Sequence, residues 1–146
     1  MRIFLDTNII TEFLFDRKYV EECSKIISSI ENHENEGIIS GGSFYTLTYL
    51  IDVNIKKSGV ENPARLEILR DVLKRILQTF NIAELSGADF LTGTQDKRFS
   101  DLEDSYQYQC AVKSLCKCIV TINKKDFPQN NTQIKILSPS EFLDLI

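Results

Sequence analysis

The sequence is poor in the residues that build zinc sites. It contains one histidine, His33, and four cysteines that do not follow the paired spacing of a four-ligand zinc centre. Cys116 and Cys118 form one tight pair, but Cys23 and Cys110 supply no matching second pair. Free cysteines in a reducing compartment are usually small buried apolar residues, and we expect these four to be buried.

Long apolar runs and an excess of positive charge are also missing. No apolar run approaches the roughly 20 residues needed to cross a membrane, and the first apolar segment, residues 3–5, is too short for a signal peptide. We therefore expect a cytoplasmic protein. The net charge of −4 argues against a protein that coats nucleic acid by bulk electrostatics. It does not exclude a nuclease, because a metal site rich in carboxylates is itself negative.

Short apolar segments alternate with amphipathic ones along all 146 residues. The chain length suits one domain, residues 1–146, which is long enough to bury a core without disulfides. The alternation predicts an α/β fold with a central, mainly parallel sheet covered by helices on both faces. We expect strands at 2–5, 37–40, 81–85, 118–122 and 134–136, and helices at 9–15, 19–30, 44–57, 66–77, 86–91, 101–115 and after Ser138.

Polar residues follow several of the predicted strands. In open parallel sheets, ligands bind beyond the carboxyl ends of the strands. The first strand ends in Asp6, the second leads into residues 40–46, and the fourth leads into Asn123 and Asp126. Asp6 has two possible roles: to cap the helix that follows it, or to serve a site at the sheet edge.

A second group of acids opens the helix predicted to start at Asp101. Asp101 and Asp104 are three residues apart and so share one helical face. Acids in a first turn can stabilise the helix dipole without any further role, and this reading stays open for Asp101 and Glu103. Clustered carboxylates without a compensating base suit a hard cation such as Mg²⁺ or Mn²⁺.

Four segments in order along the chain resemble the PIN domain family. Asp6-Thr7-Asn8 after an apolar strand resembles the opening signature, and Asp104 matches the third acidic position of the family. The segment 120–127, Val-Thr-Ile-Asn-Lys-Lys-Asp-Phe, resembles the end of the fourth PIN strand, and residues 137–143 resemble the last strand-to-helix passage. Each segment alone is weak, but together they span nearly the whole chain.

This resemblance implies a three-layer α/β/α fold and metal-dependent cleavage of RNA with Mg²⁺ or Mn²⁺. It also implies a homodimer and, as in VapC-type toxins, a small antitoxin partner. The site residues it implies are Asp6, Asp104, Asn123 and Asp126 for catalysis, Asp6, Asp104 and Asp101 for the metal, and Thr7, Asn8 and Thr46 for the substrate.

Two positions depart from the family pattern. Thr46 stands where the second acid of the family is expected, and Asn123 stands at the fourth acidic position. A hard cation depends on ligand charge for affinity. The alternative is therefore a weakened or inactive PIN-fold module that binds RNA or a protein. A flavodoxin-like or receiver-type domain also places acids at strand ends, but the sequence lacks a phosphate-binding loop to support that reading.

Overall fold

A five-stranded parallel sheet forms the centre of the protein, described here from a computed structural model that covers residues 1–130 and 132–146. The strand order is β3-β2-β1-β4-β5, and every neighbouring pair is parallel. The strands are β1 (Arg2–Leu5), β2 (Glu36–Ser40), β3 (Asn81–Ala83), β4 (Cys118–Val120) and β5 (Lys135–Leu137). The helices are α1 (Thr7–Leu14), α2 (Val20–Glu31), α3 (Gly41–Lys57), α4 (Ala64–Thr79), α5 (Gly87–Gln95), α6 (Leu102–Lys113) and α7 (Pro139–Leu145), with a 3-10 turn at Lys124–Asp126.

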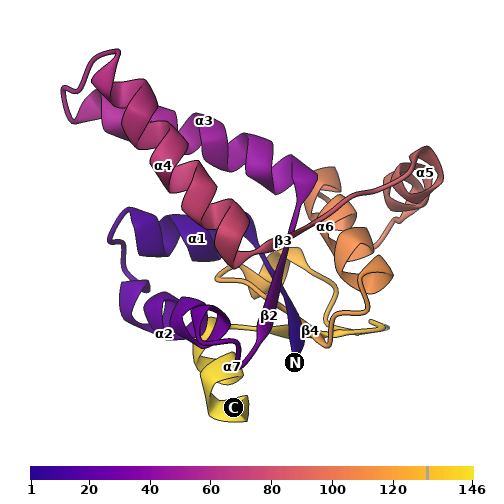
Figure 1. The fold of residues 1–146 in the computed structure, drawn as a ribbon. Helices are drawn as coiled ribbons and strands as arrows, with labels where there is room; N and C mark the ends of the chain where they lie inside the picture. Colours follow the sequence, from indigo (N-terminus) through magenta and orange to yellow (C-terminus); the bar gives the residue numbers. More distant parts are fainter. Residues whose placement is uncertain (131) are drawn as a thin grey trace.

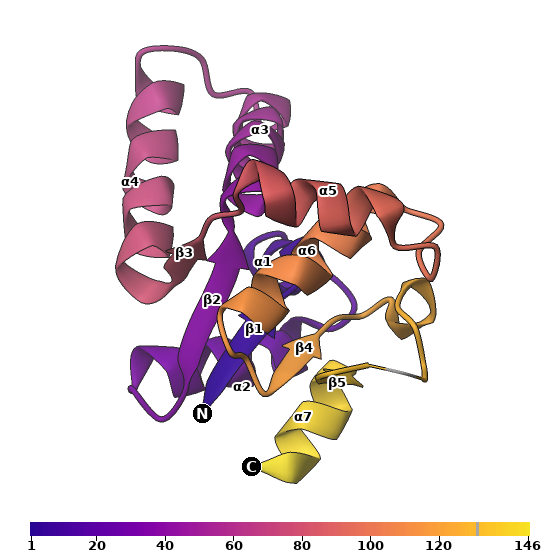
Figure 2. The same cartoon turned by 90° about the vertical axis from the view of Figure 1, so that its right-hand side faces the viewer.

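Alternate residues of the central strands enter two separate hydrophobic cores. Ile3 and Leu5 of β1 pack with α1, α2, α3, α4 and α7, whereas Phe4 points to the opposite face and packs with α6. Figures 1 and 2 show α6 and α2 on opposite sides of the sheet. The predicted three-layer α/β/α architecture is therefore confirmed.

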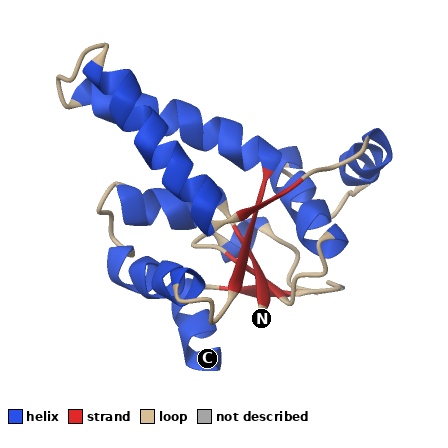
Figure 3. Cartoon of the chain, in the orientation of Figure 1, coloured by secondary structure: helices blue, strands red, loops and turns tan. Residues whose placement is uncertain are grey.

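The helices α3 and α4 pack against each other as a hairpin, and its distant end projects away from the sheet (Figures 1 and 3). Leu69 and Ile76 of α4 are buried in the core. Leu66 and Leu77, at the two ends of the same apolar pattern, are exposed. The helical spacing of 66–77 therefore serves both the core and an exposed surface.

Several predicted helix boundaries differ from the structure. The helix expected at Phe44 begins at Gly41, because the hydroxyl of Ser40 accepts the N–H of Ser43 and caps it. The helix expected to start at Asp101 begins at Leu102, because the side chain of Asp101 accepts the N–H of Glu103 and caps the helix. The helix expected to end at Leu91 continues to Gln95.

The four cysteines are buried free thiols, as the sequence predicted. Burial raises the pKa of Cys23 and Cys116 to about 12 and the pKa of Cys110 and Cys118 to about 11. They therefore contribute to packing and stay protonated at neutral pH. Among the described residues, no helix is both long and apolar enough to span a bilayer.

Candidate active site

Asp6 lies at the carboxyl end of β1, where its side chain is almost fully buried. Its backbone N–H donates to the carbonyl of Val120 at 3.0 Å, which continues the pairing of β1 with β4. The carboxylate does not cap α1, although Asp6 occupies the capping position. Its Oδ2 atom instead accepts hydrogen bonds from the Thr121 hydroxyl at 2.7 Å and the Asn8 amide at 2.9 Å. The capping role considered for Asp6 is thus wrong.

The hydroxyl of Thr121 connects the ends of β1 and β4. Besides donating to Asp6, it accepts the backbone N–H of Asn123 at 3.0 Å and the amide of Asn8 at 3.3 Å. The side-chain oxygen of Asn8 accepts the N–H of Ile122 at 3.3 Å. This network fixes the direction of the Asp6 carboxylate. It also links the backbone N–H of Asn123 to that carboxylate through the Thr121 hydroxyl.

Burial dominates the acidity of Asp6. Removal from water raises the pKa of this carboxyl, while hydrogen bonds from Thr121, the Gln107 side chain, the Thr7 N–H and Asn8 oppose the rise. A buried carboxylate held only by neutral donors is a centre of uncompensated negative charge.

Asp104, in the first turn of α6, faces the same charge centre. Partial burial raises the pKa of Asp104 to about 7, and repulsion from Asp6, Asp101, Asp126 and Glu103 adds to the rise, in that order. Every charged group in this set is a carboxylate. The structure thus brings Asp6 and Asp104 within electrostatic reach, together with the other three acids.

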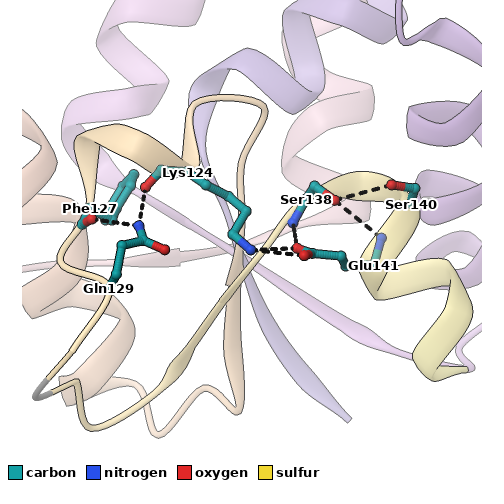
Figure 4. Close-up of polar contacts among 6 residues, drawn as sticks. All are labelled: Lys124, Phe127, Gln129, Ser138, Ser140 and Glu141. Carbon is teal, nitrogen blue, oxygen red and sulfur yellow. Dashed lines mark hydrogen bonds and ion pairs between the residues drawn. The ribbon is translucent and has the colours of Figure 1, made fainter.

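Asp101 and the segment after β4 lie at the edge of this centre. One carboxylate oxygen of Asp101 accepts the N–H of Glu103 at 2.8 Å, so Asp101 does cap α6. Asn123 and Asp126 are exposed on the turn that follows β4. That turn is held to α7 by the ion pair of Lys124 and Glu141 at 2.8 Å, and internally by Gln129, whose amide donates to the carbonyl of Lys124 (Figure 4).

Of the residues implied to contact substrate, Thr7 bonds to α3 and Thr46 lies on α3. The Thr7 hydroxyl donates to the Ser43 hydroxyl at 2.9 Å and so joins α1 to α3. Thr46 is half-buried, and its hydroxyl donates to the carbonyl of Gly42 at 3.3 Å. Thr46 also lines a cavity of about 150 Å³ that Ser43 and Gln107 share. Neither threonine hydrogen-bonds to Asp6 through its side chain among the described residues.

The sequence did not single out Ser43, Gln107 and Thr121, which are all buried around Asp6. Gln107 follows Asp104 by three residues, so helical spacing alone could have placed both on one face. The Ser43 hydroxyl donates to the side-chain oxygen of Gln107 at 3.5 Å, which links α3 to α6. A buried polar residue looks like a surface residue in the sequence, and this is why the three were missed.

These residues fit a hard cation held by few protein ligands. Within residues 1–130 and 132–146, no three His, Cys, Asp or Glu side chains form a group that could hold a metal ion. Mg²⁺ normally keeps several waters and takes only one or two carboxylates from the protein. The carboxylates of Asp6 and Asp104, which lie within electrostatic reach of each other and have no cationic neighbour among the groups that shift the pKa of Asp104, match this demand.

The raised pKa of Asp104 predicts a pH-dependent stability in EDTA. Between about pH 4 and 7 the folded protein keeps a proton on Asp104 that the unfolded chain has released. The stabilising contribution of this group is therefore complete below about pH 4 and is lost as the pH rises through 7. From pH 5 to pH 8, the melting temperature should decrease less for Asp104→Asn than for the wild type. Asp71 is exposed, so Asp71→Asn serves as the control, and its melting temperature should decrease as in the wild type. A decrease in Asp104→Asn as large as in the wild type would contradict the prediction.

Comparison with known proteins identifies the family. The PIN domain family matches residues 2–125. Ribonuclease VapC1 of Aquifex aeolicus (strain VF5) is 25% identical over 145 residues, which cover 98% of this chain and 94% of that protein. VapBC-1 from nontypeable Haemophilus influenzae has a similar fold, with a TM-score of 0.64 at 19% identity over 96% of this chain and 99% of that one. A toxin-antitoxin complex from Klebsiella pneumoniae also has a similar fold, with a TM-score of 0.63 at 21% identity over 94% of this chain and 97% of that one. The chain belongs to the PIN domain family and has the fold of VapC proteins.

Proposed function

We propose that this protein is a metal-dependent endoribonuclease that cleaves RNA phosphodiester bonds in the cytoplasm. The observation that carries the proposal is the pair Asp6 and Asp104 at the carboxyl edge of the sheet: burial raises the pKa of both carboxyls, and neighbouring carboxylates raise the pKa of Asp104 further. The similarity to Ribonuclease VapC1 over 98% of the chain supports the same activity.

In this proposal Asp6 and Asp104 hold Mg²⁺ or Mn²⁺, and Asp101 adds a carboxylate at the edge of the site. A bound divalent cation would lower the pKa of a coordinated water and stabilise negative charge on the phosphate. Thr121 and Asn8 keep the Asp6 carboxylate in one orientation through their hydrogen bonds to Oδ2.

The exposed groups of the segment after β4 complete the site. Asn123 offers a neutral amide oxygen as a ligand or a positioning group, and Asp126 offers a carboxylate that can accept a proton from the attacking water. Thr7, Asn8 and Thr46 lie on the elements next to Asp6 and would line the path of the RNA backbone.

A metal-dependent digestion of single-stranded RNA tests the proposed function. Wild-type protein is expected to cleave RNA with Mn²⁺ and to stop when EDTA is added. Asp104→Asn should lower the rate by at least about tenfold, because even residues that only support metal ligands cost about 10–100-fold. Asp71→Asn, on the exposed face of α4, should keep the wild-type rate. Equal cleavage with EDTA, or by Asp104→Asn, would refute the proposal.

We further propose a small antitoxin protein as the partner. The support is the fold similarity over 94% of the chain to the toxin-antitoxin complex from Klebsiella pneumoniae, together with the similarity to VapBC-1. Such a partner would block RNA cleavage by covering the acidic edge of the sheet.

A homodimer is also expected, through the projecting hairpin of α3 and α4. Tyr45 and Tyr49 of α3 are 81% and 68% exposed, and Leu66 and Ile68 of α4 are 41% and 42% exposed. A stable dimer needs about 800 Å² of buried surface per protomer, which large exposed apolar side chains help to supply. Sedimentation equilibrium should show a dimer that Tyr45→Asp weakens. A monomer over a wide concentration range would reject the dimer.

The second candidate function is a binding module without catalysis. It is favoured by Thr46, whose hydroxyl is bonded to a backbone carbonyl where the family pattern has an acid. The missing charges at positions 46 and 123 weaken metal binding in either case. Restoring both acids separates the two functions.

A further inference from the structure

A cavity of about 150 Å³ opens beside the proposed active site, between the start of α3, the end of β3 and the helices α5 and α6. We call it the side cavity; its lining includes Gly41, Glu84, Phe90, Glu103, Tyr106 and Gln107. A volume of roughly 10–15 Å³ is enough for one water, whereas pockets for whole small-molecule ligands occupy about 300–1,000 Å³. The side cavity therefore suits a single flat ring system.

The side cavity shares residues with the proposed catalytic centre. Gln107 lines the cavity and hydrogen-bonds to Asp6, and Glu103 lines the cavity and raises the pKa of Asp104. A ligand bound in the cavity would thus be separated from the carboxylates of Asp6 and Asp104 by one intervening residue each. Since the proposed substrate is RNA, we expect the ligand of the cavity to be a nucleotide next to the cleaved bond.

One wall of the side cavity is aromatic. Phe90 and Tyr106 form an edge-to-face pair with ring centroids 5.1 Å apart, and Phe90 is 46% exposed. Tyr106 is held in place by the hydrogen bond of its hydroxyl with that of Thr94 at 2.8 Å. A rigid aromatic surface beside a nuclease site is the usual platform on which a base of single-stranded RNA stacks.

Two carboxylates contribute to the polar part of the lining, beside Ser43, Thr46 and Gln107. The Glu84 carboxylate lies over Gly41 at the start of α3, so close that a Cβ added there would be 2.5 Å from its Oε1 atom. Within the part of the chain that the structure describes, the carboxylates of Glu84 and Glu103 take part in no hydrogen bond or ion pair. Both carboxylates are exposed and accept hydrogen bonds without donating any, so a ligand that binds to them must supply adjacent donors.

We propose that the side cavity binds a guanine base of single-stranded RNA next to the cleaved bond. Among the four RNA bases, guanine has two adjacent donor positions on its Watson–Crick edge, N1–H and the N2 amino group, and one carboxylate can accept from both. Adenine and cytosine present one amino group beside an acceptor, and uracil presents one N–H between two carbonyls. The proposal rests on the proposed ribonuclease function and adds to it a base preference.

Binding of nucleoside monophosphates in EDTA tests the side cavity without any need for cleavage. GMP is expected to bind at least about tenfold more tightly than AMP, CMP or UMP, because a good bidentate contact discriminates by about 1–3 kcal/mol, and to shift the NMR signals of Phe90 and Tyr106. Phe90→Ala should remove this preference, and Leu91→Ala, its exposed neighbour on α5, should keep it. Glu84→Gln and Glu103→Gln identify the carboxylate that reads the base. Equal binding of all four nucleotides would overturn the proposal. Tighter binding of N-acetylarginine amide, which represents an arginine side chain of a protein partner, than of GMP would also overturn it.

Cleavage mapping separates this inference from the proposed function. With Mn²⁺, wild-type protein should cut next to guanine, while Phe90→Ala should cut with the guanine preference reduced about tenfold. If the wild type and Phe90→Ala cleave with the same base preference, the proposed guanine site is wrong. The proposed ribonuclease function then still holds. Absence of cleavage together with Phe90-dependent GMP binding would refute the ribonuclease and support the cavity. Circular dichroism confirms that each variant is folded.

Discussion

Replacement of Asp6 by asparagine is expected to reduce metal-dependent RNA cleavage by at least about a hundredfold. Residues that merely support metal ligands already contribute about 10–100-fold to affinity or activity, and Asp6 is proposed as a ligand itself. The change removes one of two central charges, so the affinity for Mn²⁺ should fall with the rate. Calorimetry and RNA digestion under the same conditions measure the two effects.

The same variant should unfold at a higher temperature than the wild type in EDTA at pH 8. Burial is the main cause of the raised pKa of Asp6, which means that the folded state disfavours the charged carboxylate. A neutral amide removes this penalty, and its oxygen can still accept the hydrogen bonds of Thr121 and Asn8. A loss of activity that came from misfolding would lower the melting temperature instead.

Asp16→Asn is the matched control. Asp16 is exposed beyond the far end of α1, and its φ of 51° is a conformation that asparagine tolerates well. This variant should keep both the activity and the metal affinity of the wild type. If Asp6→Asn cleaved RNA as fast as Asp16→Asn, Asp6 would have no part in catalysis.

The strands and the fold class could be predicted because their signals are local and repeated. The first strand was placed at 2–5, as in the structure, because an apolar run ends abruptly at Asp6. Helix starts were less certain, since serine and aspartate can cap from neighbouring positions. Ser40 and Asp101 cap helices that begin at Gly41 and Leu102, where Phe44 and Asp101 were expected, a difference of one to three residues that depends on backbone geometry.

The candidate site was predictable only in part, because the role of a polar residue depends on partners distant in the chain. Asp6 and Asp101 both precede helices in the sequence, yet only Asp101 caps its helix with its side chain. The side chain of Asp6 turns instead to Thr121, 115 residues away. Gln107 reads as an ordinary helical residue until α6 is placed beside β1. Pairings between distant strand ends are what the sequence could not supply.

Restoration of the two missing acids has the second large expected effect. Thr46→Glu together with Asn123→Asp should tighten Mn²⁺ binding by about tenfold or more, since ligand charge sets the affinity of hard cations. The structure permits both changes: Thr46 is half-buried beside the side cavity, and Asn123 is exposed on the turn after β4. The only side-chain bond of Thr46 among the described residues is a 3.3 Å contact to the Gly42 carbonyl, so little is lost on its removal.

Cleavage by the double variant decides between an enzyme and a binding module. If the protein is a weakened nuclease, RNA cleavage should rise with the metal affinity, because a larger fraction of the molecules carries the activated water. If it is a binding module, Mn²⁺ binding improves while cleavage stays absent, because RNA is no longer held in line for attack. Thr48→Glu is the control: Thr48 is also half-buried on α3 and bonded to a carbonyl four residues earlier, but it faces another side of the helix. Should neither metal affinity nor cleavage exceed that of Thr48→Glu, positions 46 and 123 do not face the metal, and their match to the acidic positions of the family is wrong.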